Sequence, residues 1–200
     1  MRTFVAIDIP AAIRERIREL IEALKPAATN IRWSRPEGLH ITLKFLGEVP
    51  PAQVEQVKLA LSEVHLGDTL PIAIQGAGYF PSERSPRVIW LGISAVSELA
   101  DLAGRVETNL ELLGFAKENR PFSAHLTLGR IGTPGKIFAV QELLRKREPL
   151  AFGSFTAKEF FLYESKLSSK GSVHTKIARF DIAGSSSKAV ADSGNDKDRQ

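Results

Sequence analysis

A nine-residue phrase occurs twice in this chain, and the repeat constrains its fold more than any other feature does. Residues 35–43 read RPEGLHITL and residues 120–128 read RPFSAHLTL, so both fit Arg-Pro, three free positions, His, an aliphatic residue, Thr and Leu. Two such segments at long spacing indicate an internal duplication. We therefore expect two similar lobes, related by a pseudo-twofold axis, that face each other across a cleft.

The pattern of apolar residues predicts the elements that surround the repeat. Helical periodicity predicts helices over residues 11–24, 52–64, 95–113 and 137–146. Apolar and β-branched runs predict strands over residues 3–8, 31–33, 39–46, 69–80, 87–93, 124–131, 152–164 and 173–183. Because strands follow one another in pairs, we expect an α+β fold with two mainly antiparallel sheets facing the cleft and the helices outside. One bilobal domain should span residues 1–184, and the polar segment 185–200 should be disordered.

Each copy of the phrase lies on a predicted strand, where side chains alternate between the two faces. His40 and Thr42 should therefore share one face while their aliphatic neighbours enter the core, and His125 and Thr127 should repeat this arrangement. Two imidazoles with ordinary pKa values near 6.5 can serve as a general base and a general acid near neutral pH. Threonine hydroxyls can hold oxyanions. The combination suits in-line displacement at phosphorus, although one such histidine alone would more often be structural.

Two cations close to the phrase are further candidates for phosphate contacts. Strict alternation places Lys44 on the face of His40 and Thr42, so we expect it there. The same alternation would place Arg130 on the wrong face, unless a β-bulge at Gly129 re-aims it. Arg35 and Arg120 remain open, because the proline after each of them fixes an extended backbone whatever the function.

Other chemistries find little support in the sequence. The chain has no cysteine, which excludes disulfides, thiolate nucleophiles and cysteine-based metal sites. We find no P-loop, no HExxH and no acidic cluster with metal spacing, and we expect no metal and no cofactor. The formal net charge of +4 suits an anionic ligand such as a nucleic-acid end. No apolar run reaches membrane-spanning length, so we expect a cytoplasmic protein without a membrane partner. No second large apolar face stands out, so we expect a monomer.

The two motifs, HITL and HLTL, resemble those of the two-histidine (2H) phosphoesterase superfamily. The wider context is similar to its RNA 2′,3′-cyclic phosphodiesterase branch (LigT/ThpR, also called 2′-5′ RNA ligase). The segments that carry this resemblance are FVAIDIP (4–10), IRWSRPEGLHITLKFLGEV (31–49), PRVIWLGI (86–93), RPFSAHLTLGRI (120–131) and LYESKLSSKG (162–171).

The resemblance implies metal-independent hydrolysis of a terminal RNA 2′,3′-cyclic phosphate to a 2′-phosphomonoester. It assigns His40 as the acid that protonates the departing 3′-oxygen and His125 as the base that activates water; pseudo-symmetry leaves this direction open on the sequence alone. It also implies that Thr42 and Thr127 hold phosphate oxygens. Alternatives are a 2′-5′ RNA ligase that acts on tRNA halves, a hydrolase of small cyclic or 2′-5′ nucleotides, and a non-catalytic module that binds RNA ends. His174 stands where relatives often have an aromatic residue, and it is structural or reaches the cleft.

Overall fold

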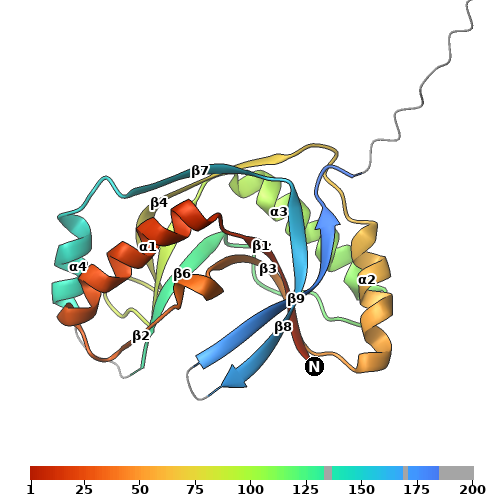
Figure 1. Cartoon of the computed structure of the whole chain (residues 1–200), viewed down its shortest axis with the longest axis horizontal. Helices are drawn as coiled ribbons and strands as arrows, with labels where there is room; N and C mark the ends of the chain where they lie inside the picture. Colours follow the sequence, from red (N-terminus) through yellow and green to blue (C-terminus); the bar gives the residue numbers. More distant parts are fainter. Residues whose placement is uncertain (133–136, 169–170, 185–200) are drawn as a thin grey trace, which may run out of the picture.

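The protein is built on two antiparallel β-sheets, seen in a computed structural model that describes residues 1–132, 137–168 and 171–184 (Figure 1). Sheet A has the strand order β3-β1-β8-β9, and sheet B has the order β2-β6-β5-β4-β7. The strands of sheet A are β1 (Arg2–Asp8), β3 (His40–Glu48), β8 (Glu159–Ser168) and β9 (Gly171–Asp181). Those of sheet B are β2 (Ile31–Trp33), β4 (Leu70–Phe80), β5 (Val88–Ile93), β6 (His125–Ile131) and β7 (Ala151–Ala157). The expectation of an α+β fold with two mainly antiparallel sheets is therefore confirmed.

Four α-helices accompany the sheets in the described part of the chain, close to the predicted ranges: α1 (Ala11–Leu24), α2 (Val54–Ser62), α3 (Val96–Glu111) and α4 (Phe138–Arg145). Helix α1 follows a strand of sheet A but lies against β7 of sheet B, where the Arg16 guanidinium donates to the Phe152 carbonyl. Helix α3 follows a strand of sheet B but packs on β3 of sheet A. Each sheet thus packs against a helix that follows a strand of the other sheet. No helix among the described residues is both long enough and apolar enough to cross a membrane.

One sequence prediction about the strands is wrong. The apolar pattern predicts a single strand over residues 152–164, whereas the structure has two, which separate at Lys158 and join different sheets. The chain leaves sheet B at Ala157 and enters sheet A at Glu159. No glycine or proline marks this break, so the local sequence carries no turn signal there. The predicted disorder of residues 185–200 lies outside the described part of the chain.

Alternating side chains along the strands create two different faces on each sheet. In sheet A, Val5 and Ile41 enter the large core that continues into sheet B. The opposite face carries a separate small cluster of buried residues, namely Phe4, Ala6, Phe161 and Tyr163. Because Ala6 pairs with Thr42 in the antiparallel ladder, this second face is also the one that carries His40 and Thr42.

The two repeat strands carry a β-bulge at the same place. In β3, Thr42 and Lys44 pair with consecutive residues of β1, so Leu43 is the additional residue. In β6, Thr127 and Gly129 pair with consecutive residues of β5, and the extra residue is Leu128. A bulge shifts the alternation by one position. As a result, the residue directly after each bulge turns towards the core.

The bulge in β3 corrects the prediction for Lys44, which does not share the face of His40 and Thr42. Its side chain is only 4% exposed and forms an ion pair with Glu107 of α3. Its Nζ also donates to the Ala116 carbonyl at 2.8 Å. Phe45, which is 65% exposed, takes the place on the other face. Lys44 therefore connects β3 to α3, and alternation failed because an additional residue intervenes.

We predict that Glu107→Ala lowers the free energy of unfolding by about 3 kcal/mol, because it leaves a buried ammonium without its carboxylate. Urea unfolding monitored by circular dichroism measures this change. The double variant Lys44→Met/Glu107→Leu should recover most of the loss, since it removes both charges. A Glu107→Ala variant as stable as the wild type would contradict the structural role of the pair.

Candidate active site

His40 and His125 begin the two repeat strands, and a local hydrogen bond fixes each imidazole. Nδ1 of His40 lies 2.6 Å from the Gly38 carbonyl oxygen. Nδ1 of His125 lies 2.7 Å from the Ser123 carbonyl oxygen, two residues earlier in the chain as in the first copy. A carbonyl oxygen only accepts, so Nδ1 carries the hydrogen in both rings. Nε2 is then the atom that takes or gives a proton.

Thr42 and Thr127 follow the histidines on the same faces, as the sequence predicts. Both are partly exposed, and neither hydroxyl has a hydrogen-bond partner among the described residues. The backbone beside Thr127 is held firmly, because Ser34 Oγ donates to its carbonyl at 2.7 Å. Each strand therefore presents a fixed imidazole and a free hydroxyl.

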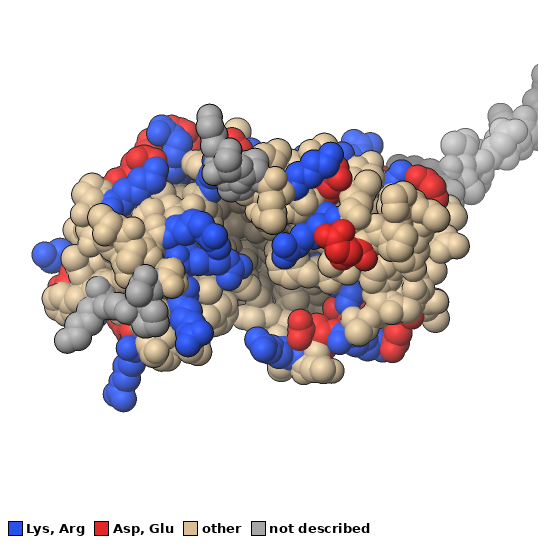
Figure 2. Space-filling view, turned by 90° about the horizontal axis from the view of Figure 1, so that it is seen from below, with Lys and Arg blue, Asp and Glu red and all other residues tan. Residues whose placement is uncertain are grey.

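Strands β3 and β6 approach each other in the middle of the molecule (Figure 1). From below, the space-filling surface is hollowed between two parts, and Lys and Arg side chains gather beside the hollow (Figure 2). The two strands match each other in the sequence of the phrase, in the position of the bulge and in the hydrogen bond that the imidazole forms. The fold thus brings the two copies of the phrase close to one another from separate sheets.

The surroundings of the two histidines differ in spite of this match. The His40 ring lies 4.6 Å from the Phe4 ring and 5.1 Å from the His174 ring, measured between centroids. Burial lowers the pKa of His40 to about 4; the bond to Gly38 opposes this shift, and the nearby His174 adds to it. In the free protein, the His40 imidazole is therefore uncharged at neutral pH.

His125 is less enclosed than His40. Its ring has one aromatic neighbour among the described residues, Phe80, edge-on at 5.0 Å. Phe4 and Phe80 thus each lie against one of the two histidines. The imidazole of the second copy is therefore the more open of the two to solvent.

The bulge in β6 turns Arg130 to the face of His125, as the sequence predicts if this strand is bulged. Arg130 pairs with Val88 in the ladder, is exposed, and lies beyond Thr127 on the face that carries His125. Gly129 fills the position that corresponds to Lys44, where a Cβ would come within 2.8 Å of Ile31 Cγ2. Arg130 forms no ion pair with any carboxylate of the described residues. Its cation is free to meet an anion.

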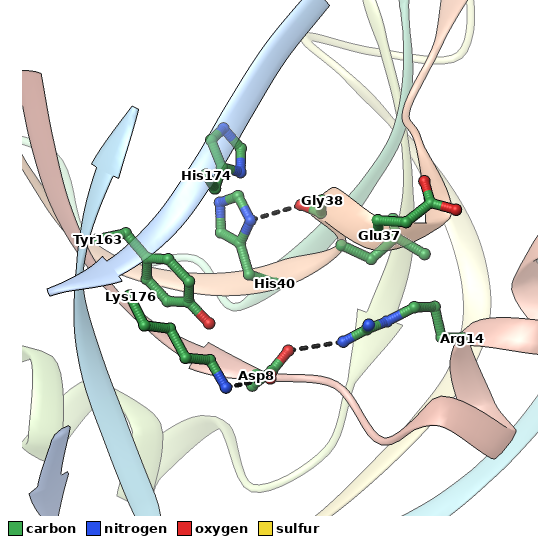
Figure 3. Close-up of a pocket in the computed structure, with 9 residues that line it drawn as sticks. Asp8, Arg14, Glu37, Gly38, His40, Tyr163, His174 and Lys176 are labelled. Carbon is green, nitrogen blue, oxygen red and sulfur yellow. Dashed lines mark hydrogen bonds and ion pairs between the residues drawn. The ribbon is translucent and has the colours of Figure 1, made fainter. Parts of the chain in front are cut away.

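A pocket of about 310 Å³ adjoins His40 (Figure 3). Asp8 lies in its wall and accepts from Arg14 and from Lys176, each at 2.7 Å. Its lining consists of Asp8, Arg14, Glu37, Gly38, Leu39, His40, Tyr163, His174 and Lys176. Its volume lies at the lower end of the range of small-molecule sites.

The sequence alone does not single out several of these lining residues. Asp8 and Tyr163 belong to strands of sheet A whose alternation could have placed them on the His40 face. Lys176 could not be placed in this way, since a register shift between β8 and β9 precedes its pairing with Tyr163. His174 reaches the site, which is one of the two roles expected for it, and its buried Nδ1 has no hydrogen-bond partner. Within the described residues, no group of three or more His, Cys, Asp or Glu could hold a metal ion.

Comparison with known proteins also finds two copies of one unit in the chain. The model of the LigT-like phosphoesterase family matches the chain twice, over residues 7–90 and 91–174. The RNA 2′,3′-cyclic phosphodiesterase of Archaeoglobus fulgidus is 36% identical over 181 residues, which cover 90% of this chain and 100% of that protein. The enzyme of the same name from Methanothermobacter thermautotrophicus is 30% identical, with 90% and 98% covered.

Solved structures agree with these matches. TT0787 of Thermus thermophilus superposes with a TM-score of 0.77 at 29% identity, covering 92% of this chain and 99% of its own. Escherichia coli LigT in complex with 3′-AMP gives a TM-score of 0.75 at 30% identity, with 90% and 97% covered. Both halves of the repeat match one family model, and the relatives align over nearly their whole length. The chain is therefore a member of the LigT-like phosphoesterase family.

Proposed function

We propose that the protein hydrolyses the terminal 2′,3′-cyclic phosphate of RNA to a 2′-phosphomonoester by acid–base catalysis from His40 and His125, without a metal ion. The observation that carries this proposal is the matched pair of imidazoles, each with Nδ1 bonded to a carbonyl and Nε2 left for proton transfer. Relatives named RNA 2′,3′-cyclic phosphodiesterases support the substrate class.

The reaction adds water across one P–O bond. His125 Nε2 takes a proton from water while the water oxygen bonds to phosphorus. On the opposite side, the bond from phosphorus to the 3′-oxygen breaks, and that oxygen receives the proton from His40 Nε2. Thr42, Thr127 and Arg130 hold the non-bridging oxygens, whose negative charge increases as the water attacks. The product keeps its phosphate on the 2′-oxygen.

The burial of His40 places a condition on its role as the proton donor. An imidazole with a pKa of about 4 is a poor proton donor at neutral pH, so His40 must gain its proton as the substrate binds. An anionic phosphate close to Nε2 favours the imidazolium and raises the pKa. The pocket beside His40 can receive the terminal nucleoside, whose 3′-oxygen then lies on the acid side.

Other functions differ in what they require of the site. Ligation to a 2′-5′ linkage would run the same steps backwards, with the two histidines exchanging roles. The site is compatible with this use on tRNA halves, and with small cyclic or 2′-5′ nucleotides, since the chemistry at phosphorus is the same. A non-catalytic module that binds RNA ends would need cations but not two oriented imidazoles. We propose that the protein works as a cytoplasmic monomer without a cofactor.

We predict that His40→Ala and His125→Ala each lower kcat by at least about 10²-fold, because each removes one partner of the proton transfer. The assay uses an RNA oligonucleotide that ends in 2′,3′-cyclic phosphate, with EDTA present, and chromatography separates the 2′- from the 3′-phosphate product. Wild-type rates should not change with EDTA. Urea unfolding provides the control for folding. Loss of wild-type turnover in EDTA, or a near-normal rate in either variant, would overturn the mechanism.

We also predict a bell-shaped pH profile of kcat/KM with an acid limb near pH 4. The ratio kcat/KM reports the free enzyme, in which the pKa of His40 is about 4. The two histidines must share one proton, so the rate rises through the lower pKa and falls through the higher one, whichever residue is the acid. Initial rates between pH 3.5 and 9 measure this, provided that circular dichroism shows a folded protein at the acidic end. An acid limb at pH 6 or above would contradict the buried, neutral state of His40.

A further inference from the structure

Six arginines lie in three segments of the chain that contain no acidic residue. The segments are residues 30–36, 84–97 and 119–132, and the arginines are Arg32, Arg35, Arg84, Arg87, Arg120 and Arg130. All six are exposed, and none forms an ion pair with a carboxylate of the described residues. Elsewhere the protein pairs many of its cations, as Arg18 pairs with Glu15 on α1.

Arg32 and Arg130 form the centre of this arrangement. They stand directly opposite each other in the antiparallel ladder of β2 and β6. Directly opposed residues point to the same face, so both cations lie on the face of sheet B that carries His125 and Thr127. Like charges at opposed positions destabilise a strand pair. The protein therefore retains two like charges that repel each other, and an anionic ligand would reduce this repulsion.

The order of the strands places Arg32 outside the reaction centre. Moving across sheet B, β6 carries His125, Thr127 and Arg130, and β2 is the edge strand beside it. Neighbouring strands lie about 4.8 Å apart, so Arg32 is one strand removed from the phosphate that Thr127 and Arg130 would hold. Trp33, on the other face of β2, contributes to the packing, whereas the Arg32 side chain makes no hydrogen bond or ion pair with the described residues that would give it a structural role.

We propose that Arg32, next to Arg130, binds a phosphodiester of the RNA strand on the 5′ side of the cyclic phosphate. This inference rests on the proposed function and adds that a single-stranded RNA of several nucleotides is bound more tightly than a mononucleotide. Basic grooves that follow the backbone are a general way to hold single strands. Arg35, two residues beyond the end of β2, is also exposed and has no ion pair among the described residues. Figure 2 shows basic side chains beside the hollow.

The test compares two substrates, a nucleoside 2′,3′-cyclic phosphate and an RNA octamer that ends in the same group. For the octamer, Arg32→Gln should raise KM roughly tenfold, the value expected for one charge-assisted phosphate contact, with kcat unchanged. For the mononucleotide, both parameters should keep their wild-type values. The salt dependence of octamer KM should decrease by about 0.7 in its logarithmic slope, because one counterion fewer is released. Arg32→Lys should recover part of the loss.

Arg18→Gln is the matched control, since it removes the same charge from the exposed surface of α1 and should affect neither substrate. An equal loss on both substrates would overturn the proposal, because Arg32 would then act in the reaction centre. An unchanged octamer KM would overturn it as well. Fluorescence anisotropy with a labelled octamer that ends in a 2′-phosphate separates this inference from the proposed function. If the wild type hydrolyses nothing, weaker octamer binding by Arg32→Gln still supports the RNA path, and equal binding refutes it.

Discussion

The hydrogen bond from each histidine Nδ1 to a carbonyl two residues earlier is the interaction on which the geometry of the site depends. It fixes the tautomer and the orientation of the ring, so that Nε2 is available at the start of both β3 and β6. The partner is backbone, and its position follows from the segment that leads into each strand. The arginine-proline dipeptides at 35–36 and 120–121 precede these segments, and after Arg35 the chain forms a short 3₁₀ helix at Pro36–Gly38 that delivers the Gly38 carbonyl. The repeated phrase thus specifies a way to hold an imidazole as well as the imidazole itself.

A duplicated scaffold gives two equal halves, whereas general acid–base chemistry needs unequal ones. The structure introduces the difference through neighbours. His40 is enclosed by Phe4 and His174, while His125 faces a single ring among the described residues. After the matched bulges, the second copy presents Arg130 where the first presents an exposed phenyl ring at Phe45. The two copies therefore differ in the residue that follows the bulge, an aromatic ring in the first and a cation in the second.

The sequence predicts the elements well, because apolar periodicity and alternation are local. Alternation also predicts that His40 and Thr42 share one face. It predicts the same for His125 and Thr127, because each His and Thr precede the bulge of their strand. For the residues after the bulge, the predicted face depends on whether the local sequence signals an irregular strand. Gly129 suggests an irregular strand, so the sequence leaves open that Arg130 shares the face of His125, whereas nothing in Leu43–Lys44 reveals the same bulge in β3. The split between β7 and β8 and the position of Lys176 depend on tertiary pairing, and neither has a local signal.

The most direct test of the opposed acid and base replaces the bridging 3′-oxygen of the cyclic phosphate with sulfur. A thiolate departs without protonation far more easily than an alkoxide, because thiols have pKa values near 8.5. The residue that protonates the leaving group then becomes dispensable, while the residue that activates water does not. We predict that His40→Ala recovers to within roughly tenfold of the wild-type rate on this substrate, and that His125→Ala keeps its full defect of about 10²-fold or more. Equal defects in both variants on the sulfur substrate would contradict the assignment of His40 as the acid and His125 as the base.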